Sequence, residues 1–279
     1  MSALSTSGRT TGGLPPAPSG VALVGRAVDF WRVQYRRTWR GTWAPTVLTP
    51  LGFLAAMGLG LGSIVDDGAR ADTLGGVSYL DFIAPGLMAA SVMQQAAFES
   101  SYPVLGAIKW AKQYHAQLAA PLRVRDVLSG HVIWVTLRLG ISAAVFLVVM
   151  GLFGTLHSPW AVLCIPAAVL TGVAWVPGMF GYAATLETDS GFALVFRFLV
   201  MPMFLFSGTF FPIEQLPPAI QPIAWITPLW HGVDLARSLS LGTIGEAPLL
   251  ALVHLLVLVA YIVGGVLAAL WTFRRRLVK

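Results

Sequence analysis

The sequence predicts an all-α membrane protein with six transmembrane helices. Its 279 residues are 56% hydrophobic and only 11% charged, whereas a soluble domain carries about 25% charged residues. Most of the 18 Lys and Arg residues fall into three clusters, at positions 9–40, 109–125 and 274–279, separated by long apolar stretches. Cytoplasmic loops of membrane proteins retain cations, whereas spanning segments exclude charge. The formal net charge of +6 therefore indicates membrane topology and argues against a nucleic-acid partner.

The chain begins with two segments that precede the first span. Residues 1–21 are rich in Ser, Thr, Gly and Pro and lack the apolar core of a signal peptide, so we predict a disordered cytoplasmic tail. Within residues 22–41, apolar and aromatic side chains recur at helical spacing while arginines occupy the other faces. This pattern favours an amphipathic helix on the inner leaflet, held by anionic lipid headgroups. The alternative is a positive flank that only fixes topology.

Residues 42–279 are predicted to form the six-span domain. A helix needs about 20 apolar residues to cross the hydrocarbon core. Stretches of that kind predict spans at 43–61, 79–102, 127–153, 160–186, 192–211 and 248–273. An even number of spans places both termini on one side. Because the three basic clusters share that side, we expect both termini in the cytoplasm of a multi-pass cell-membrane protein.

Three ionisable residues lie at or inside the predicted membrane boundary. They are Glu99, Arg138 and Arg197. Charges in spans are costly, so such residues usually pair or face a cavity. We expect an ion pair between Glu99 and either Arg138 or Arg197. In the alternative all three side chains extend to water at the cytoplasmic end, which suits Arg138 least because it lies in the middle of its span.

The loop between the second and third spans is the best candidate for contact with a soluble partner. Its sequence, VLGAIKWAKQYHAQLAAPL, contains a weak helical stripe that ends before Pro121. We predict a cytoplasmic helix from which Trp110 projects, and a projecting Trp can anchor a protein interface. The alternative is a solvated positive loop.

The segment 207–234, between the fifth and sixth spans, is apolar but interrupted by five prolines. Proline breaks a regular helix, so this segment is not expected to cross the bilayer as one straight helix. Short re-entrant or interfacial helices at the outer face are the prediction, because non-helical backbone at membrane depth must be buried in protein or line a cavity. The alternative is a hydrophobic cap with packing duties only.

Motifs for catalysis, nucleotide binding or metal binding are missing from the sequence. It has no GxxxxGK[ST] loop, no Cys/His cluster with metal spacing and one cysteine, Cys164. The acidic stretch 66–70 is interpreted as a turn because it lacks the spacing of membrane phosphotransferase motifs. We therefore predict no catalytic residue, no metal ligand and no cofactor on this chain.

Taken together, these features resemble the membrane subunit of a type-2 ABC exporter. The resemblance covers most of the chain after about residue 22, and its most specific part is SG-x-FFP…LP…PLWH within 204–231. The stretch AAFESSYPV at 96–104 is similar to the nodulation-factor (lipo-oligosaccharide) branch, which lies near the daunorubicin-type permeases.

This resemblance implies an arrangement of subunits and roles for particular residues. Two ATPase subunits, which bind ATP and Mg, would sit beneath two permeases, the second being another copy or a homologous chain. The cargo would be an exported lipo-oligosaccharide, glycolipid or hydrophobic drug. Residues implied to receive the ATPase stroke are Lys109, Trp110, Lys112, Gln113, Tyr114 and His115. Residues implied to form the outer gate are Phe210, Phe211, Pro212, Leu216, Pro217, Pro228 and His231.

Two other functional classes remain as alternatives. A stand-alone enzyme acting on lipid-linked substrates, such as a lipid phosphotransferase, would need paired carboxylates or histidines at one membrane face, and the sequence shows none. A secondary transporter usually has more spans and acidic coupling sites at the midplane, whereas the mid-span charge here is an arginine. An ATPase that copurifies in mild detergent would favour the exporter, and activity of the isolated chain would favour the others.

Overall fold

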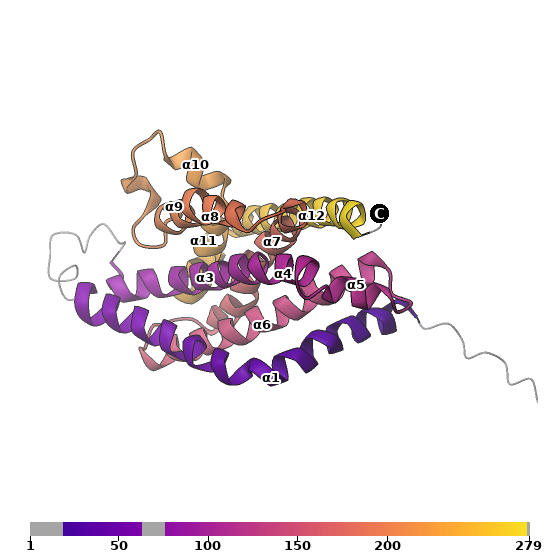
Figure 1. The fold of residues 1–279 in the computed structure, drawn as a ribbon. Helices are drawn as coiled ribbons and strands as arrows, with labels where there is room; N and C mark the ends of the chain where they lie inside the picture. Colours follow the sequence, from indigo (N-terminus) through magenta and orange to yellow (C-terminus); the bar gives the residue numbers. More distant parts are fainter. Residues whose placement is uncertain (1–18, 63–75, 278–279) are drawn as a thin grey trace, which may run out of the picture.

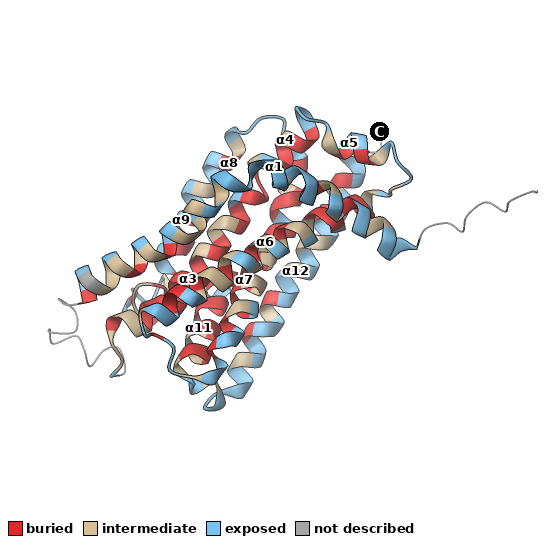
Figure 2. Ribbon diagram, turned by 90° about the horizontal axis from the view of Figure 1, so that it is seen from below, coloured by how far each residue is buried: buried red, intermediate tan, exposed pale blue. Residues whose placement is uncertain are grey.

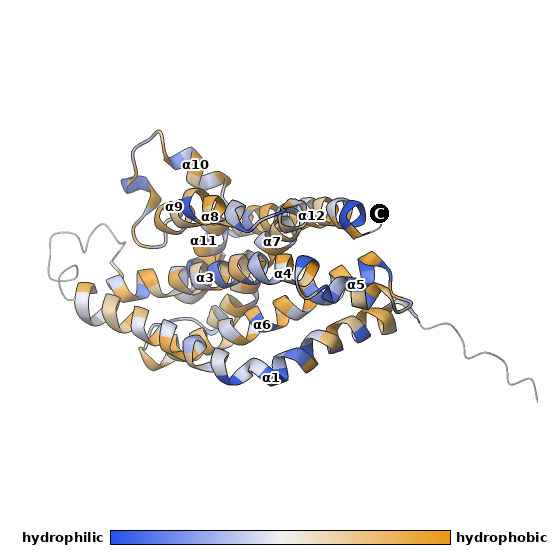
Figure 3. Ribbon diagram, viewed as in Figure 1, coloured by the Kyte–Doolittle hydropathy of each residue, from blue (hydrophilic) through white to orange (hydrophobic). Residues whose placement is uncertain are grey.

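The computed structural model describes residues 19–62 and 76–277, and within these ranges the chain is helices and turns without strands. The predictions for the tail before residue 19 and for the acidic stretch 66–70 concern parts outside the described residues. The long helices form an elongated bundle (Figure 1). The start of α1, helix α5 and the end of α12 gather at one end of it, which we call the basic end. Hydrophilic residues mark this end, most clearly at the end of α12 (Figure 3).

The structure has four segments that are long and apolar enough to cross a membrane. They match the predicted first, third, fourth and sixth spans and cover Gly20–Gly62, Val124–Leu152, Pro159–Thr185 and Pro248–Leu277. In the place of the predicted second span lies α3 (Tyr79–Glu99). In the place of the predicted fifth span lies a shorter apolar helical segment, Ser190–Phe206. Within the described residues the all-helical character is confirmed, and these four segments indicate a multi-pass membrane protein.

Helix α1 (Gly20–Ala55) joins the predicted surface helix and the predicted first span into one element. Helix α1 passes through residues 41 and 42 without a break, and the division of the chain at that point stays a prediction. The side chain of Ser19 caps the first turn by accepting a hydrogen bond from the backbone N of Ala22 at 3.3 Å. The helix contains Pro45 and Pro50 and continues into the π-helix η1 (Ala56–Gly62).

The predicted second span, 79–102, ends three residues early. Helix α3 ends at Glu99, the helix is interrupted at Ser100 and Ser101, and α4 (Tyr102–Lys109) begins with a proline in its first turn. The backbone of Ser101 is not helical, with φ of −105° and ψ of −96°, and Pro103 lies in the first turn of α4, where proline is tolerated. Helix α5 (Gln113–Leu118) then crosses the basic end (Figure 1).

The bundle is built around α7. Helix α6 (Val124–Leu152) leads through the 3-10 turn η3 (Pro159–Leu163) into α7 (Cys164–Thr185). More than half of the most apolar α7 window is buried inside the bundle (56%), against 11% for α12 (Pro248–Leu277). Figure 2 shows this contrast, with α7 largely red and α12 largely pale blue. Helix α12 therefore presents most of its apolar surface to the outside of the bundle.

Small residues allow α7 and α12 to pack backbone against backbone. A Cβ added to Gly265 of α12 would lie 2.7 Å from the backbone N of Gly178 on α7. One turn further, a Cβ added to Gly181 would lie 3.2 Å from the backbone N of Ala269. Close approach through small residues is the usual way in which membrane helices associate, because lipid provides no hydrophobic drive between them.

The predicted fifth span, 192–211, is shorter in the structure. It consists of α8 (Ser190–Val195), the π-helix η4 (Phe196–Val200) and α9 (Met201–Phe206). The chain then turns at Ser207 and Gly208, where Gly208 has a φ of +78°, a conformation that only glycine adopts readily.

Short helices follow α9, as the prolines predicted. They are η5 (Ile213–Gln215), α10 (Gln221–Ile226), α11 (Pro228–Leu241) and η6 (Thr243–Gly245). Helix α11 packs into the bundle against α3, α7 and α12, whereas η5 and α10 form a small separate apolar cluster. The segment is therefore partly core and partly cap.

Candidate functional site

A cavity of about 390 Å³ lies between α1, α3 and α6. Prolines, Val92, Phe98 and Phe146 form its apolar walls. Eight further side chains bring hydroxyl, amide or charged groups to it: Thr42, Thr46, Thr49, Ser91, Gln95, Glu99, Arg138 and Ser142. Because apolar helices surround this cavity, it can hold a molecule that has both polar and apolar parts.

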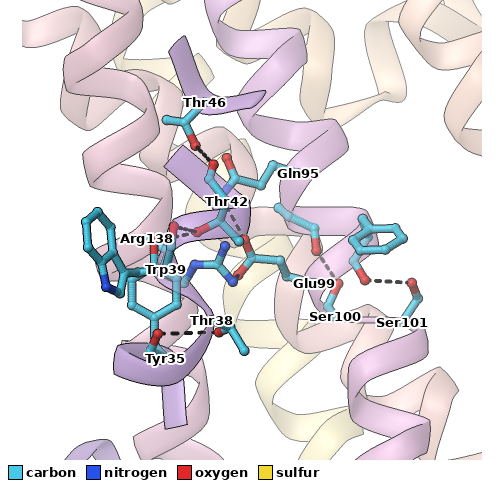
Figure 4. Close-up of polar contacts among 12 residues, drawn as sticks. Tyr35, Thr38, Trp39, Thr42, Thr46, Gln95, Glu99, Ser100, Ser101 and Arg138 are labelled. Atoms are coloured by element: carbon cyan, nitrogen blue, oxygen red, sulfur yellow. Dashed lines mark hydrogen bonds and ion pairs between the residues drawn. The ribbon is translucent and has the colours of Figure 1, made fainter. Parts of the chain in front are cut away.

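An ion pair between Glu99 and Arg138 forms one wall of the cavity (Figure 4). The Arg138 Nη1 atom lies 3.1 Å from Glu99 Oε2, and Gln95 Nε2 donates to Glu99 Oε1 at 2.7 Å. The guanidinium also lies 4.9 Å from the ring centroid of Tyr35 on α1. Glu99 is only 7% exposed, so removing either partner would leave a poorly solvated charge.

The pair settles which of the two predicted arginines meets Glu99. Arg138 reaches it because α6 packs against α3. Arg197 lies in η4 with an exposed side chain, and no ion pair joins it to another residue within the ranges described. The functional role of all three charges stays a prediction.

Hydroxyl groups of α1 extend the polar wall. Tyr35 Oη and Thr42 Oγ1 are 2.9 Å apart, and Thr46 Oγ1 donates to the carbonyl O of Thr42 at 2.8 Å (Figure 4). A threonine that donates its proton to its own helix keeps acceptor lone pairs for a ligand. The arginine supplies donors and the threonines supply acceptors, so the wall can bind hydroxyl-rich groups. In the described part of the chain, no group of three or more His, Cys, Asp or Glu residues could hold a metal ion.

The residues implied to contact an ATPase lie at the basic end but do not share one helix. Lys109 ends α4, Trp110 and Lys112 lie in the following turn, and Gln113, Tyr114 and His115 belong to α5. The expectation of one continuous helix is wrong because Lys112 adopts a left-handed conformation with φ of 47°. The Trp110 side chain is 67% exposed and projects from the turn.

Tyr114 differs from its neighbours because it is fully buried. Its hydroxyl lies 2.6 Å from Nδ1 of His131 on α6, and the Trp31 ring of α1 stacks on His131 with centroids 3.7 Å apart. Burial raises the pKa of Tyr114 well above its ordinary value, so the phenol stays protonated. Gln113 also donates to Gln34 of α1 at 2.9 Å. Helix α5 is thus attached to α1 and α6 together.

Glu187, in the turn after α7, joins three separate elements of the basic end. Its carboxylate accepts a hydrogen bond from Arg276 of α12 and lies 3.5 Å from Nζ of Lys109 on α4. The guanidinium of Arg276 lowers the pKa of this exposed carboxyl to about 2. Solvent screens such surface pairs, so the contact positions the elements more than it stabilises them.

The residues implied to form the outer gate divide between two places. Leu216 packs in the small cluster with Ile213 and Ala224, and Phe211 lies against that cluster. Phe210 packs on the main core beside Phe204, with ring centroids 5.1 Å apart. Four other residues complete the set: Pro212 and Pro217 in turns, and the buried residues Pro228 and His231 on α11.

His231 belongs to a buried network that sequence reasoning missed. Its Nδ1 lies 2.8 Å from Nδ1 of His254 on α12, and His254 Nε2 lies 3.0 Å from Asp234 Oδ2. Arg237, one turn after Asp234, donates to the carbonyl O of Gly208 at 2.7 Å. The spacing of Asp234 three residues after His231 on one helix was the available signal. The network fixes α11 against α12 and against the turn that follows α9.

Comparison with known proteins identifies the family. The family described as ABC-2 type transporter matches residues 28–241. The chain belongs to this family. Its matched region includes every residue that lines the cavity, helices α4 and α5, and all of α11.

Curated proteins of similar sequence agree with the ABC-2 assignment. Nodulation protein J of Rhizobium leguminosarum bv. viciae is 30% identical over 267 residues, which cover 93% of this chain and 100% of that protein. Nodulation protein J of Rhizobium meliloti (strain 1021) is 29% identical, covering 77% and 81% respectively. The inner membrane transport permease YadH of Escherichia coli (strain K12) is 27% identical, covering 87% and 91%.

The ABC-2 family confirms the resemblance drawn from the sequence. The chain is a multi-pass membrane permease subunit of an ABC transporter, and the family implies an ABC ATPase as its partner. The family also points to a transport subunit in place of an enzyme.

Proposed function

We propose that this permease exports an amphipathic or lipid-linked molecule from the cytoplasm or inner leaflet. The cavity between α1, α3 and α6 is the observation that supports this cargo class. It places donors of Arg138 and acceptors of Thr46 against apolar walls, so one ligand can satisfy both. The likeness of residues 96–104 to the lipo-oligosaccharide branch favours an acylated oligosaccharide over a hydrophobic drug.

The working complex would contain two permeases and two ATPase subunits, with ATP and Mg on the ATPases. Lys109 to His115 would form the ATPase contact. The exposed ring of Trp110 and the attachment of Tyr114 to His131 support this role. A push on α5 would thereby reach α1 and α6, which line the cavity. A ligand or nucleotide shifts a conformational equilibrium only through different contacts in the two states, and α5 offers such a contact.

The topology would have six spans with both termini in the cytoplasm. The 21 residues of α3 extend about 32 Å at 1.5 Å per residue, which matches a hydrocarbon core about 30 Å thick. The segment Ser190–Phe206 would be the fifth span, with α10 and α11 as re-entrant helices of the outer gate.

Transport by the intact complex can test the proposed cargo. We would coexpress the permease with its ATPase and measure ATP-dependent uptake of a fluorescent acylated tetrasaccharide into inverted vesicles. The same tetrasaccharide without its acyl chain and the acyl chain alone serve as reference cargoes. We expect uptake of the acylated sugar only.

Two matched substitutions distinguish an effect on binding in the cavity from an effect on the fold. Thr46→Val removes a hydroxyl from the cavity, and Thr136→Val removes one outside it; both hydroxyls donate to their own helix at 2.8 Å. We expect Thr46→Val to raise the concentration for half-maximal uptake several-fold and Thr136→Val to leave it unchanged. Equal uptake of the free sugar, or equal effects of the two variants, would contradict the proposal.

A further inference from the structure

Four arginines converge on a cleft at the basic end that the proposed cargo pathway does not use. Arg123 and Arg125 come from the start of α6, and Arg274 and Arg275 come from the end of α12. They line a cleft of about 660 Å³ together with Val124. The two helix ends contribute two guanidinium groups each, although they are far apart in the sequence.

Most of this positive charge has no counter-charge within the part of the chain that the structure describes. Arg125 Nε lies 3.6 Å from Asp126, whose buried carboxylate also accepts from the backbone N of Arg123. No carboxylate is paired there with the side chains of Arg123, Arg274 or Arg275. The Arg275 guanidinium instead lies over the ring of Trp271, 3.8 Å from its centroid. Converging, unpaired guanidinium groups form strong and geometrically specific sites for phosphate.

An exposed apolar path on α12 leads directly into this cleft. Val263, Leu267 and Trp271 are 53%, 64% and 55% exposed and follow one another at intervals of four residues. Residues four apart are neighbours on the surface of a helix, so these side chains form a continuous apolar path that winds slowly around α12. The next position on that path is Arg275, with Arg274 beside it.

The same pattern occurs on α6 in the opposite chain direction. Ile141, Leu137 and Ile133 are 59%, 52% and 42% exposed at intervals of four residues. The same spacing continues through the exposed residue Ser129 to Arg125. Two exposed apolar stripes therefore end in arginines that line one cleft, an arrangement that matches acyl chains below a charged headgroup.

We propose that this cleft binds the headgroup phosphate of an anionic phospholipid, with the acyl chains along the stripes of α6 and α12. Arg123 and Arg274 contact the phosphate from opposite helices, and Trp271 lies at the level of the glycerol backbone, as interfacial Trp residues do. The apolar stripes favour a lipid over a soluble anion or a protein surface. The site is separate from the cavity and does not depend on the identity of the cargo.

Native mass spectrometry of the purified chain can count the lipids that it retains. The probes are phosphatidylglycerol and phosphatidylcholine, each added to detergent micelles, and inorganic phosphate as the soluble anion. We expect one retained phosphatidylglycerol and a higher unfolding temperature with that lipid alone. The double variant Arg123→Gln/Arg274→Gln should bind it about 30-fold more weakly. Each cation near an anionic lipid surface contributes about 1 kcal/mol, and the loss of two such contributions corresponds to a change of about 30-fold in the dissociation constant.

The control is Lys112→Gln/Arg197→Gln, which removes two exposed cations that lie outside the cleft. We expect it to retain phosphatidylglycerol like the wild type, and we expect both variants to unfold at the wild-type temperature in phosphatidylcholine. Equal loss in the two double variants would overturn the proposal in favour of diffuse attraction. Equal stabilisation by inorganic phosphate would assign the cleft to a free anion. If the Arg123→Gln/Arg274→Gln variant bound phosphatidylglycerol like the wild type but no longer copurified with the ATPase, the cleft would be assigned to protein docking.

Discussion

Two adjacent glycines of α12 should respond in opposite ways to the same substitution. A Cβ added to Gly265 would lie 2.7 Å from the backbone N of Gly178, whereas a Cβ added to Gly264 has nothing within 4 Å. Non-bonded heavy atoms rest at about 3.5 Å or more. Gly265→Ala therefore requires α12 to move away from α7 by about 0.8 Å, because the obstructing atom belongs to the backbone and cannot rotate aside.

The expected cost follows from that displacement. Overpacking of a well-packed interior costs about 1–3 kcal/mol, and we expect Gly265→Ala to fall at the upper end because this helix pair is the most extensive in the bundle. Gly264→Ala should be neutral or slightly stabilising, because alanine favours the helix by up to about 1 kcal/mol over glycine. Equilibrium unfolding in mixed detergent would measure both. Equal stability of the two variants would refute the packing argument.

Three further predictions concern the basic end. Gly130→Ala should loosen the contact of α1 with α6, because its added Cβ would overlap α1. We expect it to destabilise the protein by about 1–3 kcal/mol, as measured by thermal unfolding. The control is Gly140→Ala, whose added Cβ would lie in open space. Tyr114→Phe should leave His131 without the hydroxyl that lies 2.6 Å from its Nδ1. We expect it to lower the free energy of unfolding by about 1–3 kcal/mol and to lower cargo-stimulated ATPase activity. Unchanged stability would contradict this prediction. The pKa of Glu187 is depressed to about 2, so its stabilisation is present above its ordinary pKa and is lost as pH falls towards 2. The difference in unfolding temperature between wild type and Glu187→Gln should shrink over that interval and with salt.

Much of the architecture follows from where charge is excluded. The predicted third span, 127–153, in which Arg138 is the one Asp, Glu, Lys or Arg residue, agrees with α6 (Val124–Leu152). The proline-rich segment after α9 was correctly expected to form short helices. The change in amphipathic character near residue 41 does not end α1, and the division of the chain at that point stays a prediction.

The pairing of side chains between helices was harder to predict from the sequence. The sequence left Arg138 and Arg197 as equal candidates for Glu99, because periodicity does not reveal which helices are neighbours. Tyr114 and His131, 17 positions apart, and His231 and His254, 23 positions apart, meet only through packing. For His131 and His254 the neighbouring sequence does not identify the partner, because that partner lies on another helix.

Pro45 gives the cavity a mechanical property. Without an N–H, this residue cannot complete the backbone hydrogen bond to the carbonyl of Gly41, and both residues line the cavity. A weakened point of α1 therefore coincides with the place where a guest molecule would rest. A molecule bound against Gly41 and Pro45 would restrict the bending of α1 there, so occupancy of the cavity would be coupled to the bend angle of the helix.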